Sequence, residues 1–277
     1  MSPVSGRNSR HPPVPRPRCS RSTAVLAGLL ATALVAGEAA AATPGVPPDA
    51  PVQDAPPLVA VDVGHSLAKP GAVSARGVPE FRFNRELAGA VAAALRQRRM
   101  RVLLIGEQGD ADSLVQRTTT AAGADLLLSL HHDSVQPHYL ESWQVDGRTL
   151  PYSDRFSGFS LFVSRRNPDV ARSLACARSI GAALRGIGQQ PSLHHAEPIK
   201  GEGRPLVDAA NGIYYFDGLV VLRTATSPAV LLEAGLIVNR EDELRLGDPR
   251  QQAQMASAVA DGVRSCLAAM PRSATLP

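Results

Sequence analysis

Short apolar runs alternate with longer stretches of helical periodicity between residue 58 and about residue 269. In the longer stretches apolar side chains recur every three or four positions, as on the buried face of an amphipathic helix. The short runs predict strands, at residues 58–63, 101–105, 126–130, 159–163, 219–222 and 229–232. The periodic stretches predict helices, at residues 83–98, 114–122, 168–185 and 249–269. Strands separated by such helices are typical of βαβ units, so we expect an α/β fold: a single domain with a largely parallel twisted sheet and helices on both faces.

Two long stretches lack a periodic pattern, at residues 133–158 and 188–218. Loops of this length in a compact domain are usually functional or mobile, so we expect them to form the walls of a site. Three histidines fall in them, His138, His194 and His195. Because a histidine is more often a packed or solvated residue than a ligand, we expect a surface or loop role for these three.

The first 42 residues have the three parts of a secretory signal peptide. Arginines come first, an uncharged apolar stretch of 15 residues follows at 23–37, and small residues occupy 39–42. The alternative, a membrane span, needs about 20 apolar residues, so the signal peptide is favoured. The next stretch, 43–57, contains six prolines and predicts an extended linker, before a folded domain at 58–270 and a tail at 271–277. We therefore expect an exported protein, periplasmic or secreted, with no membrane span after signal cleavage.

The net charge of +4 comes from the first 42 residues, which hold five arginines and one glutamate. The remaining residues carry equal numbers of basic and acidic side chains. A neutral domain has no overall field that attracts a polyanion, so nucleic acid is not an expected partner. Cys176 and Cys266 lie in two predicted helices, and in an oxidising compartment they form either a disulfide or a pair of buried thiols. The sequence leaves both open.

Polar residues follow several predicted strands, at the edge of the sheet where ligands of open α/β folds bind. Asp62 and His65 end the first strand, His131 ends the third, and Glu233 ends the last. Glu80 stands just before the first predicted helix. Two histidines and a carboxylate from separate elements are the ligand set of a catalytic zinc, and a further carboxylate then serves as general base. An ionised Glu233 beside an apolar strand is costly unless it is paired or functional.

These residues occur in an ordered set of motifs. The chain reads D-V-G-H to His65, has a glutamate fifteen residues later, continues with L-S-L-H to His131, and then reads P-A-V-L-L-E-A-G-L-I-V-N through Glu233. This order resembles the zinc-dependent N-acetylmuramoyl-L-alanine amidases, which are peptidoglycan hydrolases. The resemblance spans residues 58 to about 267, and residues 58–270 are thus expected to be a zinc amidase catalytic domain. It does not extend to residues 194–218, for which we expect a substrate wall particular to a subgroup.

The resemblance implies a role for each matching residue. It implies that His65, Glu80 and His131 bind Zn²⁺ and that Glu233 is the catalytic glutamate. It favours His131 over its neighbour His132, because the family's ligand follows Ser-x directly. Neighbouring strand residues also point to opposite faces, so both histidines cannot readily reach one metal. Three further residues are expected to support the ligands from behind, Asp62, Asn84 and His132. Asp62 is expected to fix the orientation of a histidine, and His132 is alternatively a packing residue.

The implied reaction is hydrolysis of the amide between the lactyl group of N-acetylmuramic acid and L-alanine of the stem peptide. Peptidoglycan is the expected partner, and an activator protein is a further partner that the resemblance leaves open. One alternative is an exported zinc peptidase or deacylase that cleaves another amide. A second alternative is a peptidoglycan-binding module that has lost catalysis, and the presence of all four key residues argues against it.

Overall fold

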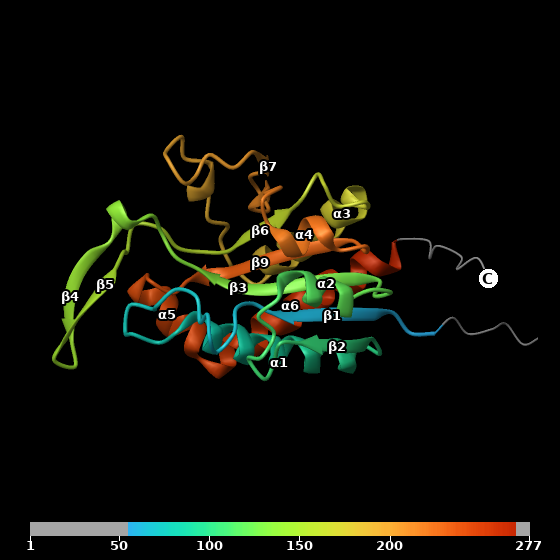
Figure 1. Ribbon diagram of the computed structural model, residues 1–277, viewed down its shortest axis with the longest axis horizontal. Helices are drawn as coiled ribbons and strands as arrows, with labels where there is room; N and C mark the ends of the chain where they lie inside the picture. The colour runs from blue at the N-terminus through green and yellow to red at the C-terminus, as the bar shows by residue number, and fades with distance from the viewer. Residues whose placement is uncertain (1–54, 270–277) are drawn as a thin grey trace, which may run out of the picture. The chain divides into compact units, whose positions relative to one another are not determined.

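The computed structural model describes residues 55–269, and its main sheet has seven strands (Figure 1). They lie in the order β2-β1-β3-β9-β6-β8-β7. Their bounds are β1 (Leu58–Val63), β2 (Arg101–Ile105), β3 (Leu126–Asp133), β6 (Ser160–Val163), β7 (Leu206–Asp208), β8 (Ile213–Tyr215) and β9 (Ala229–Leu236). The predicted signal peptide, the linker up to residue 54 and the predicted tail lie outside the described residues.

The sheet is largely parallel, as the sequence predicts. β1 pairs in parallel with β2 and β3, β3 with β9, and β6 with β8. β6 runs antiparallel to β9, and β7 antiparallel to β8. The expected α/β fold class is confirmed, and the sheet is mixed because of these two antiparallel pairings.

Helices cover both faces of the sheet unequally. The α-helices are α1 (Glu80–Gln97), α2 (Leu114–Thr120), α3 (Val170–Gly186), α4 (Val220–Thr224), α5 (Arg240–Gly247) and α6 (Pro249–Ala268). The long helices α1, α3 and α6 pack on one face over the larger apolar core, and the short α2 and α4 pack on the other (Figure 1). None of the helices in residues 55–269 has the length and apolar character that a bilayer crossing requires.

One predicted strand is wrong. Residues 219–222 begin α4, with Leu219 at its N-cap, and they form no strand. A run of four apolar residues does not distinguish a strand from a buried helical turn, because periodicity needs a longer window. Val221 and Leu222 are buried in the core beneath α2 and α4, and this packing decides in favour of the helix.

The two irregular stretches contain short elements that the sequence did not reveal. The first holds the 3₁₀ turn η1 (Pro137–Tyr139) and a hairpin of β4 (Glu141–Val145) and β5 (Arg148–Tyr152), which extends away from the main sheet (Figure 1). The second holds the 3₁₀ turn η2 (His194–Ala196) together with β7 and β8. Both stretches lack apolar periodicity because their elements are only three to five residues long.

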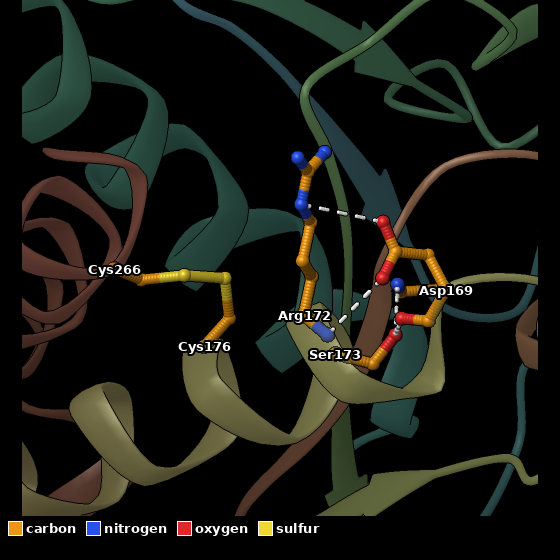
Figure 2. The surroundings of a disulfide bond; sticks show 6 residues. Asp169, Arg172, Ser173, Cys176 and Cys266 are labelled. Atoms are coloured by element: carbon orange, nitrogen blue, oxygen red, sulfur yellow. Dashed lines mark hydrogen bonds and ion pairs between the residues drawn. A yellow bond between two sulfur atoms is a disulfide. The ribbon is translucent and has the colours of Figure 1, made fainter. Parts of the chain in front are cut away.

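The helices α3 and α6 are joined covalently. Cys176 on α3 and Cys266 on α6 form a disulfide, with 4.9 Å between their Cα atoms (Figure 2). The two helices approach closely at Gly262, where a Cβ would lie 2.6 Å from the Cα of Ile180. Of the two states that the sequence left open, the structure therefore has the disulfide.

Candidate metal centre and active site

The turn after β1 carries His65 in an unusual backbone conformation, with φ of 68°. Left-handed backbone disfavours a residue other than glycine and persists only where the surroundings hold it. Arg117 on α2 holds it by donating hydrogen bonds to the carbonyl oxygens of Val63 and His65. The same guanidinium donates to the carbonyl of Ala111 and pairs with Asp62 at 2.6 Å. Arg117 and Asp62 are both almost fully buried, so the ion pair fixes the backbone from which His65 projects.

Glu80 is the first residue of α1, and its carboxylate reaches between two histidines. One oxygen lies 2.9 Å from Nε2 of His65, and the other lies 3.1 Å from Nδ1 of His131. The main-chain amides of Ala72 and His132 donate to the same carboxylate at 3.1 Å and 3.2 Å. Burial alone would raise the pKa of Glu80, but hydrogen bonds and attraction from His131 and His65 outweigh it and lower this pKa. Glu80 is therefore an anion with a fixed orientation.

His65, Glu80 and His131 come from three separate parts of the fold and meet at one point. Their candidate ligand atoms all lie within 4.8 Å of one another. Two glycines leave room for them: a Cβ on Gly71 would lie 2.3 Å from Oε2 of Glu80, and a Cβ on Gly64 would lie 2.4 Å from the ring of His131. Two imidazoles and one carboxylate are a donor set that zinc takes at catalytic sites with an open fourth position. The residues present thus fit a metal ion.

Glu233 lies on β9 directly beside this group. It is the register partner of His131 in the parallel pairing of β3 and β9, so the two side chains point to the same face of the sheet. Its Oε2 atom is buried and has no hydrogen-bond partner among the described residues. Burial, together with the negative charges of Asp133 and Glu80, raises the pKa of Glu233 well above its usual value. A buried carboxyl of this kind is suited to take up and release a proton.

Two of the expected supporting residues lie behind Glu80. The Nδ2 atom of Asn84 donates to Oε1 of Glu80 at 3.0 Å and to the carbonyl of Gly64 at 3.1 Å. Its Oδ1 atom lies 2.7 Å from Nδ1 of His132. Burial lowers the pKa of His132 to about 3, so its ring is neutral. His132 lies outside the group of converging ligand atoms that contains His131.

The third expected supporting residue, Asp62, acts differently from the prediction. The sequence suggests that Asp62 orients a histidine ring. Among the described residues its carboxylate bonds to Arg117 and, at 2.7 Å, to the hydroxyl of Ser129, and not to an imidazole. Asp62 therefore influences His65 through Arg117 and the backbone. Arg117 itself gave no signal in the sequence, because its partners come together only in the folded chain.

Comparison with known proteins supplies the observation that decides the family. The family model described as N-acetylmuramoyl-L-alanine amidase matches residues 59–265. The chain belongs to this amidase family. The resemblance seen in the sequence is thereby confirmed, and the protein is a peptidoglycan amidase, which is a hydrolase.

Solved structures agree with the fold of the amidase. Ami1 from Mycobacterium smegmatis has 19% identity and a TM-score of 0.60, with 77% of this chain and 98% of that chain covered. The catalytic domain of CwlV from Bacillus (Paenibacillus) polymyxa var. colistinus has 26% identity and a TM-score of 0.57, with 76% and 97% covered. CwlD from Clostridioides difficile, in complex with the GerS lipoprotein, has 16% identity and a TM-score of 0.54, with 77% and 100% covered. No curated protein sequence matches the amidase significantly.

The amidase has a cleft beside the histidines. A cavity of about 400 Å³ is bounded on one side by His65 and His131. Its opposite wall is apolar and comes from α2 and α4, with Leu114, Leu219 and Val221 among its residues. Small-molecule sites commonly combine an apolar wall with a few polar groups in this way. The face covered by the short helices is therefore the face that a substrate can reach.

A second histidine cluster was missed in the sequence. His138 is exposed, as expected. His194 and His195 lie in the irregular stretch but are buried, so of the surface or loop role expected for them the surface position is wrong. They lie in η2 and contact Asp133 at the end of β3. The only signal in the sequence was their adjacency within a long aperiodic stretch, because the partner Asp133 is 61 residues before His194 along the chain.

Proposed function

We propose that the amidase depends on zinc and hydrolyses the amide between the lactyl group of N-acetylmuramic acid and L-alanine. The observation that supports this is the convergence of His65, Glu80 and His131 next to the unpartnered Oε2 of Glu233. A zinc ion held by these three residues would supply a Lewis acid and lower the pKa of a nearby water. An amide has a poor leaving group, so the reaction also requires a residue that moves protons.

Glu233 has that role in the proposal. Its carboxylate takes a proton from the attacking water and gives it to the departing amine nitrogen of alanine. Asn84 keeps the ligand Glu80 in position, because its Nδ2 atom donates both to Glu80 and to the carbonyl of Gly64 in the turn after β1. The apolar wall from α2 and α4 limits access of bulk water to the scissile bond.

The test is the substitution Glu233→Gln, which keeps the shape of the side chain and removes its basicity. We expect kcat on purified sacculi to fall about 10²- to 10⁴-fold. The number of zinc ions bound per chain, measured by elemental mass spectrometry, should stay at the wild-type level. A matched control is Glu241→Gln, at an exposed position in the first turn of α5, which should leave kcat unchanged. Stem-peptide release by Glu233→Gln within a few-fold of wild type would contradict the assigned role.

The products separate the alternatives. Mass analysis of digested peptidoglycan should show a new free amino group on L-alanine. A new amine elsewhere would indicate a peptidase or deacylase, and binding to sacculi without any product would indicate an inactive binding module. Each of these outcomes would contradict the proposal.

The proposal also covers the compartment in which the amidase acts and its protein partner. Peptidoglycan lies outside the cytoplasm, so we place the protein in the periplasm or outside the cell. Activation by a partner protein stays a prediction, and CwlD, which was solved with the GerS lipoprotein, is the relative that motivates it. Full hydrolysis of sacculi by the purified chain alone would contradict a required activator.

A further inference from the structure

A second group of ligand atoms converges at the carboxyl end of β3. The Oδ2 atom of Asp133 lies 2.9 Å from Nε2 of His195 and 3.2 Å from Nε2 of His194. All three candidate ligand atoms lie within 4.8 Å of one another. The two histidines are 3% and 8% exposed, so the group is inside the protein and not on its surface. We propose that Asp133, His194 and His195 form a second binding site for a divalent transition metal, of which Zn²⁺ is the best match.

Direct hydrogen bonding among the three residues does not account for their closeness. The atoms Asp133 Oδ2, His194 Nε2 and His195 Nε2 are all buried, and none has a hydrogen-bond partner among the described residues. Their separations are short, but their directions do not suit an N–H···O bond. Buried polar atoms without partners are rare in native proteins, and three at one point require an explanation. Ligand atoms at 2.0–2.1 Å from a tetrahedral zinc are about 3.3 Å apart, which is close to the observed separations.

The opposite ring nitrogens have the outer partners that metal-binding histidines need. Nδ1 of His195 lies 2.9 Å from Oε2 of Glu202, whose other oxygen accepts a hydrogen bond from Gln136 at 2.8 Å. Nδ1 of His194 lies 2.9 Å from the hydroxyl of Ser192. A ring that donates from Nδ1 to a carboxylate or hydroxyl keeps the lone pair of Nε2 for a metal. These contacts thus fix the orientation of each ring and leave Nε2 within 3.2 Å of Oδ2 of Asp133.

Aromatic side chains fix the planes of both rings. Phe156 stacks on His194 with 5.2 Å between ring centroids, and Phe162 on β6 contacts His195 edge-on at 4.9 Å. Burial of both rings strengthens the attraction between a cation and Asp133. The donor set of two imidazoles and one carboxylate matches that of the first centre, so both sites select the same kind of ion.

The two centres are neighbours but have different ligands. His131 and Asp133 lie two positions apart on β3, so their Cα atoms are at most about 7 Å apart. The second site joins β3 to η2, and η2 belongs to residues 194–218, to which the motif resemblance seen in the sequence does not extend. A metal there would fasten this stretch to the central strand, next to Glu233.

The test counts metal ions per chain. The full chain is stripped with a chelator, dialysed against Zn²⁺, and analysed for protein-bound zinc. We expect two ions in the wild type, one in His195→Gln, one in His65→Gln, and none in the double variant. The control His138→Gln, at an exposed position in η1, should keep two ions.

Different failures of the test have different meanings. A single ion in the wild type that is lost in His65→Gln and kept in His195→Gln would overturn the second site, and Asp133 would then form an ion pair with His195 and nothing more. A single ion lost only in His195→Gln would support the second site and contradict the zinc centre of the proposed function.

A second measurement does not depend on how well His195→Gln folds. Co²⁺ replaces Zn²⁺ in the His65→Gln variant, and its visible absorption reports the coordination number. We expect the intense absorption of four-coordinate Co²⁺ and a rise of Tm on metal addition. Absence of both in a variant whose circular dichroism matches wild type would overturn the proposal.

Discussion

Arg117 offers the sharpest test of how the fold positions His65. Its guanidinium is 2% exposed and pairs with Asp62, which is 1% exposed. The substitution Arg117→Met keeps the apolar stem and removes the charge. It leaves the carboxylate of Asp62 buried without a counter-charge and removes the donors to the carbonyls of Val63 and His65. Breaking a buried pair by removing one partner costs about 3–5 kcal/mol.

That loss is large against the total stability of a domain, which is about 5–15 kcal/mol. For a domain of this size each kcal/mol changes Tm by roughly 2–4 °C, so Arg117→Met should melt at least about 6 °C below wild type. The assays are thermal unfolding, which gives Tm, and urea unfolding, which gives the free energy of unfolding, both on the full chain and followed by circular dichroism. Freed from its hydrogen bonds, the left-handed turn at His65 also relaxes, and we expect zinc affinity to fall about 10- to 100-fold.

A double-mutant cycle separates the charge from the carbonyl contacts. Asp62→Asn combined with Arg117→Met leaves no unpaired charge and should be more stable than Arg117→Met alone. Arg82→Met removes an exposed ion pair with Glu86 on α1 and should cost less than about 1 kcal/mol. The reasoning is refuted if Arg117→Met costs no more than Arg82→Met, or if adding Asp62→Asn lowers stability further.

Two other predictions follow from the structure. The disulfide between Cys176 and Cys266 closes a loop with a sequence separation of 90, for which chain entropy alone gives about 4.6 kcal/mol. Reduction, or replacement of both cysteines by alanine, should lower the free energy of unfolding by about 2–4 kcal/mol, and a calorimetric Tm that does not respond to reductant would contradict this. Gly71→Ala places a Cβ 2.3 Å from Oε2 of Glu80 at a φ of 81°, so bound zinc and activity should both be lost. Gly89→Ala, inside α1 with open space around it, should instead stabilise by about 0.5–1 kcal/mol, and equal metal binding by both variants would count against the assigned centre.

The sequence predicts those parts of the fold in which local pattern and tertiary packing agree. The long helices α1, α3 and α6 have a buried face with a clear period, and the central strands are apolar on both faces. α5 was not predicted, because its sequence REDELRLG is dominated by charge. It forms because Asn239 caps its first turn and because Leu246 packs into the larger core. Both are contacts with neighbours rather than properties of the segment.

The candidate site follows the same rule. His65, His131 and Glu233 each follow an apolar strand, so the sequence places them at one edge of the sheet. Their closeness then depends on the strand order β1-β3-β9, which residue spacing does not specify. The cluster at Asp133 was beyond prediction, because it requires the stretch 188–218 to fold back over β6. Nothing periodic in that stretch indicates its path.

The unequal covering of the sheet explains why the chemistry lies where it does. Adjacent strand positions alternate between faces, so Asp62, Ser129, His131 and Glu233 share the face of α2 and α4, whereas His132 points to the other. On that other face α1, α3 and α6 have 18, 17 and 20 residues, and they pack over the larger apolar core. α2 and α4 have only 7 and 5 residues, so the carboxyl ends of β1, β3 and β9 stay uncovered beside the cavity. Glu80 joins the two faces, because the first turn of α1 reaches past the end of β1. Lengthening α2 or α4 toward these strand ends would therefore block the cleft without touching a proposed ligand, and it should raise KM before it changes metal content.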